Sequence, residues 1–363
     1  MRAPAALALA VMVASAGCWL DQPYKHRNTT VPEQLADGWT VSTPESVGID
    51  PTVLAAIHDE ILREDRYFGI LGLLVVKDGR LVFETYTRSV DDRDLKHALQ
   101  SATKSVTSLV LGAARDRGAV PELDTTLCSI VADACAGIEP AKLEITLDHL
   151  LTMRSGIEFD NSTFSLEIMV DRPSDPLRYI LQKPMYASPG EQFYYRDADP
   201  QLVSYALQRL TGRTLESLGA EYLFAPLGIT DWFWDSVPGG ASTGAFALHL
   251  RPRDFAKLGQ MMLDGGRWDG AQVVSSEWCS LATTPHADTG EGGPDNPRSY
   301  GYYFWIPTTP VSFAFWGHGG QFVLVVPGKN LVLVQVALPD TSGDDLHGGM
   351  PEDFIGLTRP LWQ

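Results

Sequence analysis

The strand-forming segments of this chain lie at its two ends, and the part between them is rich in helix and loop patterns. Two apolar runs separated by Asp78-Gly79, a dipeptide typical of hairpin turns, predict a hairpin over about 69–86. Four more apolar runs predict strands at about 302–306, 311–315, 321–326 and 331–337. Strands from both ends can form one antiparallel sheet whose faces are covered by helices. The sequence therefore predicts an α+β fold with a mostly helical region inserted in its middle.

Helical patterns give this prediction approximate boundaries. They predict helices at about 52–64, 101–117, 147–153, 200–210 and 252–264. We assign residues 46–363 to one domain, with an α/β part over about 46–118 and 241–363 and a helical part over about 119–240. A ligand cleft is expected where the two parts meet.

Residues 1–18 have the composition of an export signal. Arg2 gives a short basic start, and residues 5–13 form an apolar run that is too short to span a bilayer. Small residues follow this run, as they do before a cleavage site. We therefore expect the mature protein to be exported to the bacterial cell envelope.

Two cleavage sites remain open. Ala-Ser-Ala at 14–16 is an ordinary signal-peptidase site, whereas Ser-Ala-Gly-Cys at 15–18 resembles a lipobox, whose cysteine is lipidated and becomes the mature N-terminus. We favour lipidation of Cys18, which would attach the protein to a membrane. The polar segment 19–45 is predicted to be a tether.

The other cysteines fit an oxidising compartment. Cys128 and Cys135 flank a short loop and can form a disulfide, and Cys279 is predicted to be a buried small hydrophobe. The chain has neither a cysteine pair with metal-ligand spacing nor a His-Glu-x-x-His motif. The sequence therefore predicts no metal site.

The charge balance argues against two kinds of negatively charged partner. The formal net charge is −17, which opposes binding to nucleic acid and to anionic membrane surfaces. Membrane attachment would therefore depend on a lipid at Cys18.

One serine is placed to act as a nucleophile. Ser101 stands where an apolar helix is predicted to begin, and Lys104 completes the only Ser-x-x-Lys in the chain. Residues three apart lie on one helix face, and the helix N-terminus favours negative charge near the serine. A lysine kept neutral by burial can accept the serine proton. The alternative is that Ser101 is only a helix cap and that Lys104 is solvated.

A second serine has a motif of its own. Ser242 is the centre of Gly-Ala-Ser-Thr-Gly at 240–244, which spells a nucleophile elbow. That elbow requires a buried strand before it and a helix after it. Residues 232–239 are a poor strand with a proline near the end, so we predict that Ser242 is not catalytic.

Two further segments follow the Ser-x-x-Lys motif along the chain, which gives three segments in a fixed order. They are Ser101-x-x-Lys104, the stretch 189–197 that ends in Tyr195-Arg196-Asp197, and the run Gly-His-Gly-Gly-Gln at 317–321. Together with four other stretches, at 150–156, 226–231, 250–259 and 265–270, they resemble the serine β-lactamase-like hydrolases. That family includes class C β-lactamases, DD-peptidases, family VIII esterases and relatives of 6-aminohexanoate-dimer hydrolase. The resemblance extends from about residue 45 to the end and implies a β-lactamase/transpeptidase-like fold without a cofactor.

The resemblance also implies roles. Ser101 resembles the acylated nucleophile, Lys104 the amine that activates it, and Tyr195 the tyrosine that passes a proton to the leaving group. The backbone N–H groups of Ser101 and Gln321 are then the expected oxyanion hole.

The remaining matched positions are expected to bind substrate. His318, Gly319 and Gly320 occupy the place of Lys-Thr-Gly on the strand that lines the cleft, and Asp197 occupies the place of an asparagine. Adjacent glycines suit a backbone that a substrate approaches closely.

Two of these positions depart from the family pattern. Asp197 adds a carboxylate near Lys104, which favours the charged amine and shifts proton transfer toward Tyr195. His318 replaces a fixed positive charge, so a substrate carboxylate, such as that of a β-lactam, should bind less well. Arg196 would restore the positive charge if it pointed into the cleft, and this alternative stays open.

We therefore predict an exported serine hydrolase that acts through an acyl-enzyme on small esters, amides or peptide-like substrates. Ester or amide hydrolysis is favoured over true β-lactamase activity. The alternative is a protein of the same fold without turnover: a penicillin-binding or sensor protein, or an inactive scaffold. Catalytic rather than stoichiometric product release distinguishes the two.

Overall fold

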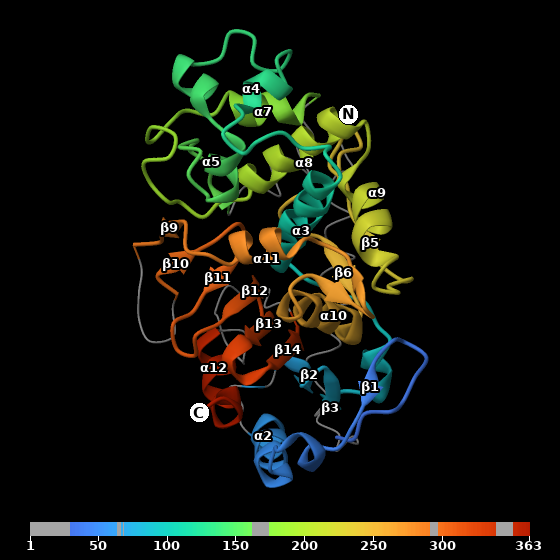
Figure 1. Cartoon of the computed structure of the whole chain (residues 1–363). Helices are drawn as coiled ribbons and strands as arrows, with labels where there is room; N and C mark the ends of the chain where they lie inside the picture. The colour runs from blue at the N-terminus through green and yellow to red at the C-terminus, as the bar shows by residue number, and fades with distance from the viewer. Residues whose placement is uncertain (1–29, 64–66, 68, 162–173, 291–296, 339–350) are drawn as a thin grey trace, which may run out of the picture.

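In the computed structural model, which describes residues 30–63, 67, 69–161, 174–290, 297–338 and 351–363, one nine-stranded sheet joins both ends of the chain (Figure 1). Its strand order is β1-β3-β2-β14-β13-β12-β11-β10-β9. The strands are β1 (Thr40–Val41), β2 (Ile70–Lys77), β3 (Arg80–Tyr86), β9 (Ala287–Asp288), β10 (Ser299–Tyr300), β11 (Trp305–Ile306), β12 (Phe313–Gly317), β13 (Gln321–Val326) and β14 (Leu331–Ala337). The pairing of β14 with β2 joins the two ends, and it is antiparallel. The α+β fold and its antiparallel sheet are thus confirmed.

The predicted hairpin is β2–β3. Its turn residues Asp78 and Gly79 both have positive φ, at 52° and 72°, as a two-residue hairpin turn requires. Leu73 and Val75 belong to one hydrophobic cluster, and Leu74 and Val76 belong to the other. Alternate residues of β2 thus face opposite sides, and the strand is apolar throughout because both sides are covered.

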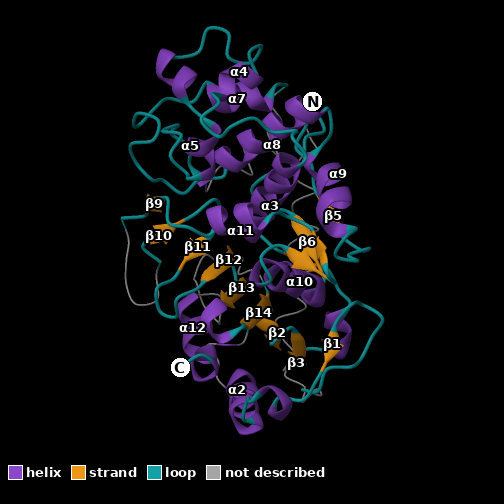
Figure 2. Cartoon of the chain, viewed as in Figure 1, coloured by secondary structure: helices purple, strands orange, loops and turns teal. Residues whose placement is uncertain are grey.

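Some helices lie against this sheet, and others, among them α4, α5, α7 and α8, gather at one end of the molecule (Figure 2). The α-helices are α2 (Pro51–Arg63), α3 (Ala102–Asp116), α4 (Leu127–Ile130), α5 (Leu147–Leu151), α7 (Pro176–Leu181), α8 (Ala198–Thr211), α9 (Leu215–Gly219), α10 (Pro252–Leu263), α11 (Ser276–Ala282) and α12 (Pro351–Thr358). A π-helical turn lies at Ala220–Phe224, and 3-10 turns lie at Glu45–Val47, Val90–Arg93, Pro140–Glu144, Pro327–Lys329 and Arg359–Leu361. The small strands are β4 (His97–Ala98), β5 (Phe233–Trp234), β6 (Leu248–Leu250), β7 (Arg267–Trp268) and β8 (Ala271–Gln272).

Helix α3 connects the two parts of the molecule. It lies between the sheet and the group formed by α4, α5, α7 and α8 (Figure 1), and it contacts both β12 and α8. Residues 102–114 are all buried. One face of the sheet packs on α10, and the other packs on α2 and α12. The first turn of α3 is therefore held rigidly where the helical part meets the sheet.

Some predicted boundaries differ from the structure. The helix predicted at 147–153 ends at Leu151, because Met153 has a positive φ of 58°. The strand predicted at 302–306 is reduced to β11, because Tyr303 has a φ of 65°. Left-handed backbone at a residue other than glycine ends a regular element, and side-chain periodicity does not reveal it.

The cysteines are placed as follows. A disulfide joins Cys128 and Cys135, whose Cα atoms are 5.7 Å apart. Among the cysteines that the structure describes, Cys279 is free and buried. Cys18 lies outside the described residues.

The tether prediction for 19–45 is wrong in its C-terminal part. Trp39 is buried, and its indole Nε1 donates to the Arg253 carbonyl at 3.1 Å. Asp37 pairs with the Arg253 guanidinium at 2.8 Å, and β1 pairs in parallel with β3. A buried tryptophan and an ion pair therefore fix this segment to the domain. In the described residues, no helix has both the length and the apolar character needed to cross a membrane.

Candidate active site

Ser101 lies at the N-terminal end of α3. The segment before it is fixed by β4, which pairs with β6, and by the Leu99 N–H, which donates to the Leu248 carbonyl at 2.8 Å. Gln100 has a positive φ of 49°, so the chain turns sharply into the helix. Among the described contacts, the Ser101 hydroxyl makes no capping bond to the helix. The hydroxyl is thus available for another role.

The hydroxyl meets the amine of Lys104. Lys104 Nζ lies 2.8 Å from Ser101 Oγ, 3.1 Å from the Ala245 carbonyl oxygen and 2.6 Å from Asp197 Oδ1. The lysine side chain is only 1% exposed. The solvated-lysine alternative is therefore wrong, and the amine joins three segments that are distant in sequence.

The charge state of this amine follows from its surroundings. Burial lowers the pKa of Lys104, but the Asp197 carboxylate and Tyr195 outweigh that effect and raise the pKa above the usual lysine value. An ammonium has three N–H donors, and three acceptors surround this nitrogen. These surroundings favour the ammonium form of Lys104.

Tyr195 lies beside this ion pair. The centroid of its ring is 4.9 Å from Lys104 Nζ. The ring stacks on Trp305, with centroids 5.4 Å apart, and meets Tyr300 edge to face at 6.2 Å. The neighbouring Tyr194 is 48% exposed. Of the two adjacent tyrosines, Tyr195 is the one that reaches the amine.

Arg196 is fully buried, and its charge is engaged elsewhere. The guanidinium donates to the Tyr186 hydroxyl at 2.7 Å and to the Ile157 carbonyl oxygen. It also lies 3.8 Å from the Asp199 carboxylate. The alternative in which Arg196 restores a positive charge to the cleft is therefore wrong.

The end of β12 lies against the first turn of α3. A Cβ atom added to Gly317 would come within 2.1 Å of the Leu99 carbonyl oxygen and 3.2 Å of the Ala102 nitrogen. Only glycine permits this approach. Gln321 pairs with Gly317 in the sheet, so the start of β13 is also brought near the start of α3.

The structure corrects the predicted placement of His318, Gly319 and Gly320. These residues form the turn between β12 and β13 rather than part of a strand. Gly319 and Gly320 have positive φ values of 71° and 89°, which the prediction of a strand did not include. His318 is exposed on this turn. The side chain of Gln321 donates to the Ala337 carbonyl at 2.6 Å, so any role of Gln321 in the site belongs to its backbone.

Ser242 has a structural role. Its hydroxyl is buried and accepts a hydrogen bond from the Glu216 N–H at 2.9 Å, in the first turn of α9. The element after it is strand β6, not the helix that a nucleophile elbow requires.

Sequence reasoning missed two groups of the site. Asn161 accepts from the Asp197 N–H at 2.7 Å and donates to the Tyr195 carbonyl at 3.2 Å. The Ala245 carbonyl oxygen is an acceptor for Lys104. One residue of the polar run 160–163 and a backbone carbonyl carry no distinctive sequence pattern, so no signal pointed to either.

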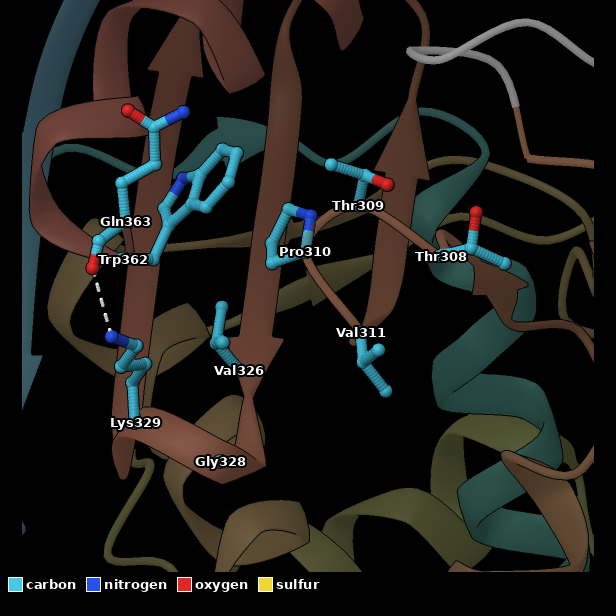
Figure 3. A pocket seen from close by; sticks show the side chains of 9 residues that line it. All are labelled: Thr308, Thr309, Pro310, Val311, Val326, Gly328, Lys329, Trp362 and Gln363. Carbon is cyan, nitrogen blue, oxygen red and sulfur yellow. Dashed lines mark hydrogen bonds between the residues drawn. The ribbon is translucent and has the colours of Figure 1, made fainter.

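A pocket of about 320 Å³ lies elsewhere (Figure 3). Val311 and Val326 line it together with Trp362. In the β12–β13 register, Phe313 pairs with Val325 at this end and Gly317 pairs with Gln321 at the other. The pocket is thus separated from Ser101 by the length of these strands. In the described part of the chain, no three His, Cys, Asp or Glu side chains cluster as metal ligands.

Comparison with known proteins gives one family and several relatives. The family model described as Beta-lactamase matches residues 59–345. A 6-aminohexanoate-dimer hydrolase of Paenarthrobacter ureafaciens is 27% identical over 309 residues, which cover 79% of this chain and 78% of that protein.

Solved structures share the fold. A putative 6-aminohexanoate-dimer hydrolase from Bacillus anthracis has a TM-score of 0.67 at 17% identity and covers 94% of this chain and 87% of its own. EstCE1, a hydrolase with promiscuous acyltransferase activity, has a TM-score of 0.66 at 15% identity and covers 85% and 97%.

Proposed function

The chain belongs to the beta-lactamase family and is a serine hydrolase of that family, and we propose that it hydrolyses neutral esters or amides through an acyl-enzyme formed on Ser101. The observation that carries the proposal is the 2.8 Å contact between Ser101 Oγ and a buried Lys104 amine at the start of α3. The name of the Paenarthrobacter relative, a 6-aminohexanoate-dimer hydrolase, supports hydrolysis of a small substrate.

In the proposed reaction, Ser101 Oγ attacks the substrate carbonyl carbon. Tyr195 Oη accepts the Ser101 proton and gives its own proton to the leaving oxygen or nitrogen, so the bond to the leaving group breaks as the acyl bond to Oγ forms. Backbone N–H groups of Ser101 and Gln321 stabilise the oxyanion. Water then attacks the acyl carbon, and its proton returns to Ser101 through Tyr195.

Lys104 acts here as a cation. It donates a hydrogen bond to Oγ and so stabilises negative charge on the attacking oxygen. A competing mechanism uses a neutral Lys104 whose two N–H groups serve Ala245 and Asp197, while its lone pair accepts the Ser101 proton. The charge of Lys104 distinguishes these two mechanisms.

Replacing Asp197 with asparagine tests the state of charge. The change keeps the shape but removes the carboxylate that raises the pKa of Lys104, so that pKa falls relative to the wild type. We expect ester hydrolysis by Asp197→Asn to decline with rising pH at a lower pH than in the wild type, because the ammonium loses its proton earlier. Asp133→Asn, which removes a carboxylate from an exposed pair with Arg209, is the matched control and should leave the profile unchanged. A variant whose rate instead rises at neutral pH would show that neutral Lys104 is the base.

The charge of the cleft predicts its selectivity. Arg196 is engaged with Asp199, Asp197 is acidic, and His318 stands in the position of a lysine. A charge-assisted hydrogen bond contributes about 1.5–3 kcal/mol, so its loss costs about 10- to 150-fold in kcat/KM. We expect short p-nitrophenyl esters to be hydrolysed far more efficiently than nitrocefin. We expect His318→Lys to bring the two kcat/KM values closer together. Wild-type enzyme that hydrolyses nitrocefin as efficiently as its best ester would refute the charge argument.

We also propose export and lipidation of Cys18, supported by the composition of residues 1–18. The mature protein should carry a diacylglyceryl mass and partition into detergent, and Cys18→Ser should release it. A mature N-terminus at an unmodified Gly17 would show cleavage after Ala16 instead.

A further inference from the structure

Two of the side chains that contact Lys104 flank one residue whose side chain points elsewhere. Tyr195 and Asp197 approach the amine, and Arg196 between them is completely buried. Its Nε donates to the Tyr194 carbonyl at 2.9 Å, and its Nη2 donates to the Tyr186 hydroxyl at 2.7 Å. The guanidinium is thus anchored to its own segment and to the neighbouring segment that carries Tyr186.

A third segment completes this anchor. Arg196 Nη1 donates to Ser155 Oγ at 3.4 Å. Ser155 Oγ in turn donates to Asp199 Oδ1 at 2.6 Å, and the Ser155 N–H donates to the second Asp199 oxygen at 3.3 Å. Arg196 and Asp199 are both 0% exposed and 3.8 Å apart. A buried charge without its partner is costly, so each residue holds the other in place.

Asn161 holds the same tripeptide through its backbone. Its side-chain amide donates to the Tyr195 carbonyl and accepts from the Asp197 N–H. Asn161 therefore bonds the backbone on both sides of Arg196, as a neighbouring strand would. The backbone of the tripeptide is held by Asn161, and the side chain of its middle residue is held by the Ser155–Asp199 pair.

We propose that Asn161, Arg196 and Asp199 are positioning residues that hold Tyr195 and Asp197 against Lys104. The inference rests on the proposed function, because it assigns these residues to the alignment of that site. None of the three is assigned a contact with the substrate. Misplacement of a reacting group by about 1 Å costs up to about 100-fold in rate.

The experiment measures the rate at which a serine-reactive phosphonate labels Ser101, per folded molecule, across pH. The variants are Asn161→Ala, Arg196→Met, Arg196→Lys and Asp199→Asn. Arg178→Met is the matched control, because Arg178 also donates to two loop carbonyls, those of Ala134 and Ala136, at 3.4 and 2.9 Å. Melting temperatures and p-nitrophenyl ester kinetics are measured in parallel.

We expect the phosphonate to label Ser101 about 10- to 100-fold more slowly in Asn161→Ala and Arg196→Met than in the wild type. The alkaline decline of their profiles should also begin at lower pH, because a displaced Asp197 no longer raises the pKa of Lys104. Esterase kcat should fall more than KM changes, Arg196→Lys should recover part of the rate, and Arg178→Met should stay within about twofold of wild type. A purely structural role would lower the melting temperature without moving the pH profile.

Folded Asn161→Ala and Arg196→Lys proteins with wild-type rate and profile would overturn the inference, even if Arg196→Met does not fold. Failure of wild-type labelling, or labelling that survives Ser101→Ala, would instead overturn the proposed function.

Discussion

Ser101→Ala is expected to lower ester turnover by about 10⁴-fold or more, because removing the nucleophile of a serine hydrolase abolishes the acyl-enzyme route. Lys104 should remain paired with Asp197 at 2.6 Å, so the melting temperature should change little. Steady-state kinetics with a p-nitrophenyl ester measure the effect.

Ser242→Ala is the control for this result. It removes the acceptor of the Glu216 N–H and should cost about 1 kcal/mol of stability without changing kcat. Turnover that survives Ser101→Ala and disappears with Ser242→Ala would contradict the assignment of the site.

Lys104→Met is expected to have the second largest effect, on both activity and stability. It removes the hydrogen bond to Ser101 Oγ and leaves Asp197, whose side chain is 14% exposed, without its cation. We expect kcat to fall by about 10²- to 10³-fold and the free energy of unfolding to fall by about 3 kcal/mol. Urea unfolding and ester kinetics measure the two effects.

A double variant separates stability from catalysis. Lys104→Met with Asp197→Leu removes both charges, so much of the lost stability should return while kcat stays low. A single Lys104→Met variant with wild-type kcat would exclude the cation from the mechanism.

The sheet could be predicted from the sequence because its main strands are continuous apolar runs with turn residues between them. Strands β2 and β14 belong to opposite ends of the chain, yet each is apolar at nearly every position, as a strand covered on both sides must be. The pattern does not specify that β14 pairs with β2; that pairing is known from the structure.

The candidate site could be predicted only where a motif marks it. Ser101 and Lys104 are three residues apart on one helix, so their contact follows from helix geometry. Ala245 is 141 residues from Lys104 in sequence, and Asn161 is one of several polar residues in the run 160–163. Contacts of that kind depend on the packing of distant segments, which local periodicity does not encode.

The orientation of Arg196 depends on the same packing. Alternation of side chains places Arg196 opposite Tyr195 and Asp197, but the partners that hold it, Ser155 and Asp199, are known only from the fold. The tether prediction fails around Trp39 for a similar reason: the composition there is that of a linker, and the hydrogen bond from Trp39 to the Arg253 carbonyl joins segments 214 residues apart.

Mapping of the acyl-enzyme tests the central claim most directly. Wild-type protein is mixed with a p-nitrophenyl ester, quenched in acid during the burst, digested and analysed by mass spectrometry. The account predicts one acyl group on Ser101, with the acylated fraction falling to zero after the substrate is consumed and with many equivalents of acid released per protein. An acyl group on another residue would contradict the assigned nucleophile. A Ser101 adduct that persists after one equivalent of acid is released would show that the protein acylates without turnover.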